Sequence, residues 1–293
     1  MRDLHQLASF ASAARHGSFA AAARELGVTP STVAKSISRL EADLGVSLFT
    51  RSTRSVRLTE EGTWLFKRCS TIFDEIETIE SALRSMRKSP VGKLRIDAPI
   101  VYGRQFIVPV LAEMQFRYPA LEIDLHLSDE IIDIVSEGFD AAVRIGTLKD
   151  SSLIAIEIDR QQLITCASPA YLARHSTPAT IDDLAAHSCL AFALPSTGRP
   201  RPWSFIHDNQ AVELEIAGRT RANEGEALRD TALLGVGVAQ LPDYMVRAQI
   251  ASGQLVEILP NYRSPPMPIS VIATRSRLAL PRLRAFIERV KRR

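Results

Sequence analysis

The stretch GSFAAAARELGVTPSTVAKSISRLE, residues 17–41, decides the fold of the N-terminal part of the chain. Ser18 is suited to cap a first helix, and Gly27 is suited to end it because glycine adopts a positive φ without strain. Thr29 can cap a second helix at once, with Pro30 at its first position, where the missing N–H costs nothing. The stretch therefore predicts two short helices joined by a tight turn, a helix-turn-helix.

The second helix of this pair has an apolar side and a polar side. Val33, Ile37, Leu40 and Leu44 recur at helical spacing and predict the face that packs on the core. In a helix-turn-helix the polar face enters the major groove of DNA, whose base edges carry a readable code. The residues expected to contact bases or phosphates are Thr29, Ser31, Thr32, Lys35, Ser36 and Arg39. The alternative is a helical hairpin whose charged residues are only solvated.

A basic segment follows the two helices. LFTRSTRSVRLT, residues 48–59, predicts two short strands, and Arg51, Arg54 and Arg57 are expected to neutralise phosphates without reading sequence. Residues 1–68 carry ten Lys or Arg and six Asp or Glu, a balance of +4, whereas the whole chain carries +3. Double-stranded DNA is therefore the favoured partner, and a hairpin with merely solvated charges is less favoured. The cap residues, these arginines and the helix described next all support this interpretation.

The clearest periodicity of the chain begins after Thr59. Apolar residues step alternately by four and three along one seam, which consists of Leu65, Cys69, Ile72, Ile76, Ile79, Leu83 and Met86. This spacing, sustained over about three heptads, is typical of a helix that pairs with a copy of itself. An amphipathic helix packed on its own domain is the alternative. KSPVGK, residues 88–93, predicts the break that ends the helix.

From Leu94 to the C-terminus, short strands alternate with helices. The segments KLRIDA, LEIDLHL, DAAVRIG and PISVIATR predict strands, and residues 103–117, 130–138, 224–234 and 281–291 predict helices. This order predicts an α/β fold with a mostly parallel sheet. Because the series restarts near residue 162, we expect two similar α/β halves of about 100 residues each.

The chain resembles the LysR-type transcriptional regulators. Residues 17–62 match that family's winged helix-turn-helix nearly throughout, and a weaker collinear likeness continues through YPALEIDLHLSDEIIDIVSEGFDAAVRIGTLKDSSL, CASPAYLARH and ANEGEALRDTALLGVGVAQLP. The resemblance implies a sequence-specific DNA-binding transcriptional regulator. It also implies a homodimer built by the linker helix, commonly paired into tetramers, on an operator with dyad symmetry. RNA polymerase is a further candidate partner.

The resemblance also implies a domain order. We expect a winged helix-turn-helix, then a linker or dimerisation helix, then a two-subdomain α/β effector domain like the periplasmic binding proteins. A small-molecule effector held between the two subdomains would modulate DNA binding. The expected boundaries are 1–60 for the DNA-binding domain, 61–89 for the linker helix, 90–293 for the effector domain, 90–161 with 269–293 for subdomain I, and 162–268 for subdomain II.

The effector is expected outside the carboxyl ends of the strands, where helix N-termini offer N–H groups to an anion. The candidate residues are Ile100, Val101, Ser128, Ala193, Leu194, Pro195, Asn223 and Glu224. Ser128 matches a hydroxyl position of the family, whereas Ile100 and Val101 stand where carboxylate-binding members often place a hydroxyl. Arg199 and Arg201 are suited to attract an acidic effector, so an anionic effector is a candidate.

Other classes of function find less support in the sequence. The six histidines have no metal-ligand spacing, and neither GxSxG nor GxGxxG occurs, so we expect no catalytic residue, metal or cofactor. Without an export signal or a long apolar run, we expect a cytoplasmic protein with no membrane partner. Two alternatives stay open: a redox-sensing regulator that uses Cys166 or Cys189, and a cytoplasmic solute-binding protein without a role on DNA.

Overall fold

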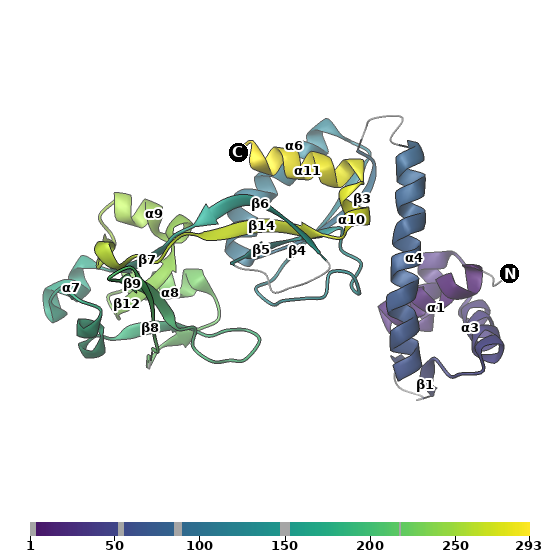
Figure 1. Cartoon of the computed structure of the whole chain (residues 1–293), viewed down its shortest axis with the longest axis horizontal. Coiled ribbons are helices and arrows are strands. Elements are labelled where there is room, and N and C mark those ends of the chain that lie inside the picture. The colour runs from purple at the N-terminus through teal and green to yellow at the C-terminus, as the bar shows by residue number, and fades with distance from the viewer. Residues whose placement is uncertain (1–3, 52–55, 85–89, 147–152, 217) are drawn as a thin grey trace.

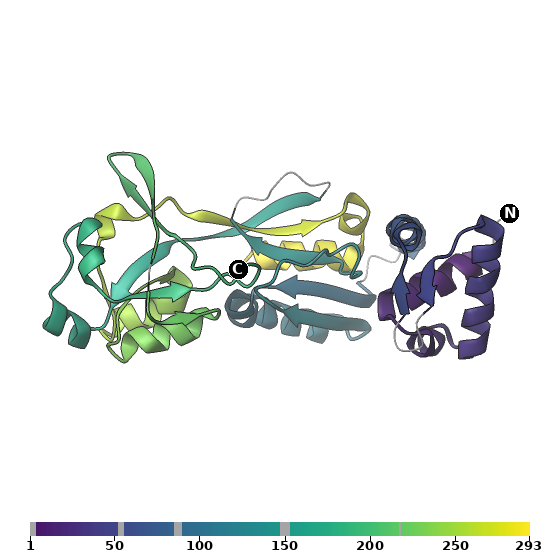
Figure 2. The ribbon, with the colours of Figure 1, turned by 90° about the horizontal axis from the view of Figure 1, so that it is seen from below.

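The computed structural model describes residues 4–51, 56–84, 90–146, 153–216 and 218–293. A helical N-terminal part, a long helix and two α/β lobes follow one another along the chain, and they lie in a row in space (Figures 1 and 2). We call the lobe next to the long helix lobe I and the outer one lobe II. Within the described residues, no helix is both long and apolar enough to cross a membrane.

The N-terminal part contains three helices, α1 (Leu4–His16), α2 (Phe19–Leu26) and α3 (Pro30–Leu44). The expected caps are present. The hydroxyl of Ser18 accepts a hydrogen bond from the N–H of Ala21 at 3.3 Å, and Gly27 ends α2 with a φ of +66°. The predicted helix-turn-helix is confirmed.

The inward side of α3 also follows the prediction. Val33, Ile37 and Leu40 are buried against Phe10 of α1, and Leu44 is half-buried at the edge of the same core. Because these four residues hold one side of α3 against the domain, its opposite side is left to solvent.

Two short strands follow, β1 (Phe49–Arg51) and β2 (Val56–Leu58), which pair antiparallel as predicted. The long helix α4 (Glu60–Arg84) comes next and lies alongside the N-terminal helices (Figure 1). Leu65 and Cys69, the first two residues of the predicted seam, pack into the N-terminal core, whereas Ile72 is 45% exposed. The first turns of α4 thus pack on their own domain. The side chains of Ile79 and Leu83, and all of Met86, lie outside the described residues.

Lobe I is built on a five-stranded sheet with the order β4-β3-β5-β14-β6. Its helices cover a core that contains Leu94, Ile96, Met114 and Phe286. The strands are β3 (Gly92–Ala98), β4 (Leu121–Leu127), β5 (Ala141–Ile145), β6 (Ile154–Gln161) and β14 (Met267–Ala273); the helices are α5 (Ile100–Tyr102), the π-helical turn η2 (Gly103–Ile107), α6 (Val108–Arg117), α10 (Arg275–Leu278) and α11 (Pro281–Lys291).

Lobe II repeats the plan with the order β11-β8-β12-β7-β13 and a separate hairpin of β9 and β10. Its strands are β7 (Leu163–Ala167), β8 (Cys189–Phe192), β9 (Trp203–His207), β10 (Gln210–Leu214), β11 (Arg221–Ala222), β12 (Val238–Pro242) and β13 (Val256–Glu257). Its helices are α7 (Pro169–His175), η3 (Asp182–Ala186), α8 (Gly225–Leu233), α9 (Asp243–Ala251) and η4 (Pro260–Tyr262). The two expected α/β halves are therefore present.

Two expectations about the α/β part are wrong. The sheets are mixed, because β14 pairs antiparallel with β5 and β6, and β7 pairs antiparallel with β12 and β13. The predicted helix 130–138 is a turn. The carboxylate of Asp133 accepts from the N–H groups of Val135 (3.1 Å) and Ser136 (3.3 Å), and these bonds compete with a continuing helix. Gly138 ends the turn with a φ of +71°.

Candidate nucleic-acid interface and effector site

The polar face of α3 is accessible. Thr29, Ser31, Thr32, Lys35 and Arg39 are exposed, and Ser36 is half-buried. The Thr29 hydroxyl caps α3, since it accepts from the N–H of Thr32 at 3.2 Å. It also lies 2.9 Å from the Ser31 hydroxyl and 2.8 Å from the Thr32 hydroxyl. The first turn of α3 therefore presents a cluster of three hydroxyl groups to solvent, next to Lys35 on the following turn.

The arginines of the strand pair are described in part. Arg57 is exposed in β2, opposite Thr50 of β1. Arg51 is the last residue of β1, and nothing is described of its side chain; Arg54 lies outside the described residues. The structure thus adds one accessible cation, Arg57, to the polar face of α3.

The candidate effector residues are gathered by two pairs of parallel strands. In lobe I, β3 and β4 run side by side, and the N–H of Ser128 donates to the carbonyl of Ala98 at 3.0 Å. In lobe II, β8 and β11 run side by side, and the N–H of Ala193 donates to the carbonyl of Ala222 at 2.8 Å. The loops at 98–102 and 128–130 are therefore neighbours, as are the loops at 193–196 and 223–225.

Most of these candidates are accessible. Ile100, Ser128, Ala193, Leu194, Pro195 and Glu224 are half-buried, and Asn223 is exposed. Val101 is 2% exposed, so its side chain has no surface to offer to a ligand. The Ser128 hydroxyl is engaged, because it accepts from the N–H of Glu130 at 3.0 Å.

Several contacts join the two lobes, and the residues that make them are not among those predicted from the sequence. Arg104 Nη1 lies 2.6 Å from Glu226 Oε2 across the junction. The ring of Tyr244, from α9, packs edge-on against Tyr102 at 5.6 Å and Phe106 at 5.5 Å. A sequence signal existed only for Glu226, in the loop-to-helix turn that also carries Glu224.

Two carboxylates in the loops of this junction accept hydrogen bonds from backbone N–H groups. Asp129 follows Ser128 in lobe I, and its Oδ1 accepts from the N–H of Ile100 at 3.1 Å. Glu224 of lobe II caps α8, because its carboxylate accepts from the N–H groups of Glu226 (2.9 Å) and Ala227 (2.7 Å). Burial raises the pKa of Asp129, the bond from Ile100 opposes this, and the negative charge of Glu224 raises it further.

One arginine of lobe II, Arg201, has no counter-ion among the described residues. Arg201 follows the turn after β8, its N–H donates to the carbonyl of Phe192 at 2.8 Å, and its guanidinium lies 5.5 Å from the Phe192 ring centroid. The Nε of Arg201 is buried and has no hydrogen-bond partner within the part of the chain that the structure describes. Burial lowers the pKa of Arg201, whereas the nearby phenol of Tyr244 opposes that shift. Burial raises the pKa of Tyr244, and the negative charge of Asp129 raises it further.

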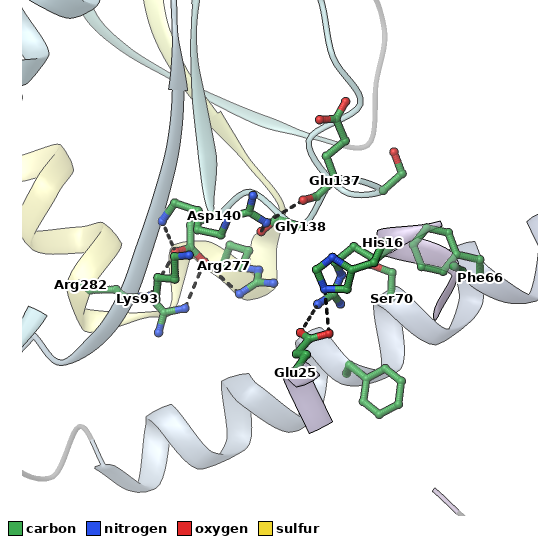
Figure 3. A pocket seen from close by; sticks show the side chains of 15 residues that line it. His16, Glu25, Phe66, Ser70, Lys93, Glu137, Gly138, Asp140, Arg277 and Arg282 are labelled. Atoms are coloured by element: carbon green, nitrogen blue, oxygen red, sulfur yellow. Dashed lines mark hydrogen bonds and ion pairs between the residues drawn. The ribbon is translucent and has the colours of Figure 1, made fainter. Parts of the chain in front are cut away.

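A pocket of about 820 Å³ lies between the N-terminal part, α4 and lobe I (Figure 3). His16 and Glu25 line it from one side, and Asp140, Arg277 and Arg282 line it from the other. The Ser70 hydroxyl of α4 donates to the carbonyl of Val135 at 3.2 Å, and the guanidinium of Arg95 donates to the carbonyls of Glu137 (2.8 Å) and Gly138 (3.2 Å). The turn at 134–138 thus lies between α4 and β3, and the other end of β3 leads to the candidate effector residues of lobe I.

The two cysteines of the redox alternative are buried. Burial raises the pKa of Cys166 to about 12, with a further contribution from Glu257, and burial raises the pKa of Cys189 to about 11. Both thiols therefore stay protonated at neutral pH, which disfavours reaction with an oxidant because the thiolate is the reactive form. The structure lends the redox alternative no support.

A helix-turn-helix with a strand pair, followed by a long helix and two α/β lobes, defines a transcriptional regulator with an effector domain. Residues 4–63 match the bacterial regulatory helix-turn-helix proteins of the lysR family, and residues 87–293 match the LysR substrate binding domain. The chain belongs to the LysR family of transcriptional regulators.

Curated proteins that match this chain over nearly their whole length are transcriptional regulators. The chain is 35% identical over 289 residues to the HTH-type transcriptional regulator PtxR of Pseudomonas aeruginosa. The aligned region covers 99% of this chain and 92% of PtxR. It is 34% identical over 284 residues to the HTH-type transcriptional regulator CrgA of Neisseria meningitidis. That alignment covers 97% of this chain and 94% of CrgA.

Solved full-length structures show the same architecture. The structure of CrgA, a LysR-type transcriptional regulator from Neisseria meningitidis, superposes with a TM-score of 0.63 at 32% identity. The superposition covers 100% of this chain and 99% of the CrgA chain. The structure of the virulence activator AphB of Vibrio cholerae superposes with a TM-score of 0.61 at 27% identity. The superposition covers 99% of this chain and 98% of the AphB chain.

Proposed function

We propose that this regulator binds an operator with dyad symmetry as a homodimer, or as a pair of dimers, and that the first turns of α3 read the bases. The observation that carries the proposal is the face of α3, where Thr29, Ser31, Thr32, Lys35 and Arg39 are exposed while the opposite side is buried. Arg57, together with Arg51, Arg54 and the half-buried Ser36, would contact phosphates or support that contact.

Dimerisation would use the outer part of α4. Ile72 is 45% exposed on a helix of 25 residues, and the a/d spacing continues beyond it. This supports a self-pairing seam that begins where contact with the N-terminal core ends. The proposed divisions are residues 1–60 for DNA binding, 61–89 for pairing and 90–293 for the effector; the return of the chain through β14 to the sheet of lobe I supports the split of the last part.

The effector would bind where the lobes meet, among Ile100, Ser128, the loop at 193–195, Asn223 and Glu224. Its binding would change how the lobes close, and β3 and the turn at 134–138 would pass the change to α1 and α4. Contact with RNA polymerase and a cytoplasmic location are parts of the same proposal. An anionic effector, attracted by Arg199 and Arg201, is also part of the proposal.

A gel shift tests the DNA-binding part. The full-length protein should bind a fragment from upstream of its own gene in the presence of excess random DNA, and should release it steeply as salt rises. A Lys35→Ala variant should bind less well, whereas Lys291→Ala, at the exposed C-terminal end of α11, should behave like the wild type. Equal binding to random and upstream DNA would contradict the proposal.

A further inference from the structure

The pocket between the N-terminal part, α4 and lobe I is rich in basic side chains (Figure 3). Its volume of about 820 Å³ falls within the range of about 300–1,000 Å³ that small-molecule sites occupy. Of the described residues that line it, five are arginine or lysine and three are aspartate or glutamate, a balance of +2 with His16 neutral. A hollow lined by an excess of one charge concentrates ions of the opposite sign, so this pocket attracts anions.

In the lobe I wall of the pocket, two cations share one carboxylate. The ammonium group of Lys93 lies 2.9 Å from Oδ2 of Asp124, and Nε of Arg95 donates to the same oxygen at 3.1 Å. Nη1 of Arg95 donates to the backbone carbonyls of Glu137 and Gly138, which carry no net charge. The carboxylate of Glu137 points away from the N-terminal helices (Figure 3). Asp124 can therefore balance only one of the two cations of this wall.

In the opposite wall, a cation is held by an exposed pair. Nη1 of Arg15, from α1, donates to Oε1 of Glu25, from α2, at 3.2 Å, and Nε2 of His16 lies 3.1 Å from the other oxygen of that carboxylate. The side chains of Arg15 and Glu25 are 37% and 39% exposed. Exposed ion pairs contribute little to stability, so Arg15 can take a ligand as its partner at small cost.

The two walls meet at Gly138. A Cβ atom on Gly138 would lie 3.3 Å from Nη1 of Arg95 and 3.9 Å from Nε of Arg15. One guanidinium group of lobe I and one of the N-terminal part therefore lie beside the same residue. These like charges repel each other, and an anion in contact with both would replace the repulsion by two attractions. A guanidinium group binds a phosphate or a carboxylate through two parallel hydrogen bonds.

We propose that this pocket binds a small oxyanion with at least two negative charges, held between Arg15 of α1 and the pair of Arg95 and Lys93 at the start of β3. The site is separate from the candidate effector residues, because these follow the other end of β3. It is also separate from the proposed DNA-binding face, because α3 lies on the far side of the N-terminal part from lobe I (Figures 1 and 2).

The position of the pocket gives the anion a mechanical role. Arg15 belongs to the DNA-binding part, whereas Lys93 and Arg95 belong to lobe I, so a ligand that contacts all three joins the two parts of the chain. The bound anion would favour the arrangement in which the turn at 134–138 lies against α4 and oppose other angles between the DNA-binding part and lobe I.

Calorimetric titration of the full-length protein at constant ionic strength tests the proposal. The probes are pyrophosphate and citrate, with acetate as the singly charged comparison. Pyrophosphate or citrate should bind at least tenfold more tightly than acetate, and the tighter of the two identifies phosphate or carboxylate as the preferred group. Arg15→Gln and Lys93→Gln should each weaken that binding at least fivefold. Arg24→Gln and Arg117→Gln, at exposed positions of α2 and α6 outside the pocket, should keep it.

Two further measurements locate the bound anion. Lys35→Ala and Arg57→Ala should bind the probe like the wild type, whereas a loss in either would place the anion on the DNA-binding face and overturn the proposal. Hydrogen exchange with saturating probe should show added protection both at the C-terminal end of α1 and in the turn at 134–138.

Three other outcomes would also overturn the proposal. These are no binding of either multivalent probe, protection of only one wall, and equal losses in the pocket variants and in the Arg24→Gln and Arg117→Gln controls. Because no DNA and no effector enter these titrations, their outcome is independent of the gel shift that tests the proposed function.

Discussion

Arg282 of α11 donates to both carboxylate oxygens of Asp140, from Nε to Oδ2 at 3.2 Å and from Nη2 to Oδ1 at 3.1 Å. Arg277 of α10 donates to the same carboxylate at 2.9 Å, and both Asp140 and Arg282 are buried. One side chain before β5 therefore joins the C-terminal helices to the end of lobe I that faces α4 and the DNA-binding helices.

Replacement of Asp140 by Asn should lower the free energy of unfolding of the α/β part by about 3–5 kcal/mol, because two guanidinium groups would lose their shared anion in a buried setting. Chemical unfolding followed by circular dichroism measures this. Glu288→Gln, at an exposed position on α11, is the control and should change stability by less than about 0.5 kcal/mol. A similar loss in both variants would show that the buried pairing is not what stabilises this end of the lobe.

The cap of α3 gives a second prediction. Thr29→Ala removes the acceptor for the N–H of Thr32 and should destabilise the N-terminal part by about 1 kcal/mol. Thr29→Ser keeps the hydroxyl and should restore most of that stability. Protection of the α3 amides from hydrogen exchange reports the change locally. If the serine variant lost as much protection as the alanine variant, the hydroxyl would not act as a cap.

The third prediction separates base reading from phosphate contact. Arg57→Ala should weaken binding to all DNA sequences alike and reduce the slope of log K against log salt by about 1, since one phosphate contact is lost. Thr32→Ala should change the preference among operator variants and leave the salt slope nearly unchanged. Titrations at several salt concentrations on two operator variants measure both effects, with the exposed Arg292→Ala as control. A uniform loss for Thr32→Ala would place it among the phosphate contacts.

The fourth prediction concerns the cysteines. Because burial raises the pKa of Cys166 to about 12 and that of Cys189 to about 11, iodoacetamide should label neither thiol in the native protein at pH 8. A folded-state pKa above the unfolded value of 9.0 stabilises the fold below that pH, and this contribution is lost as the pH rises through the folded-state pKa. Alkaline unfolding between pH 9 and pH 12 should therefore be shifted in a Cys166→Ala variant. Rapid labelling at pH 8, or DNA binding that changes with peroxide, would favour the redox alternative.

The N-terminal part could be predicted nearly residue by residue because its signals are local. Ser18, Gly27 and Thr29 fix the ends of α2 and α3 through their own backbone preferences, and the spacing of Val33, Ile37 and Leu40 fixes which side is buried. The apolar spacing of residues 130–138 predicts a helix, whereas the structure has a turn at 134–138, because the Asp133 carboxylate accepts from backbone N–H groups there.

The candidate effector site could be predicted only as a set of loops. Strand ends indicate where a ligand should lie, but the pairing of Arg104 with Glu226 and the approach of Tyr244 to Tyr102 join residues more than 100 positions apart. Asp129 carries no sequence signal of its own. Its carboxylate accepts from the N–H of Ile100, which the parallel pairing of β3 and β4 brings within reach.

Footprinting of the full-length protein on DNA from upstream of its own gene, combined with interference by methylation at guanine N7, tests the central claim most directly. The claim is that the exposed side of α3 lies in the major groove, in two copies. The expected result is two protected half-sites related by a dyad, their centres separated by whole turns of about 10 base pairs, with N7 methylation blocking binding within them. Protection without N7 interference, or protection that follows no sequence, would contradict the account.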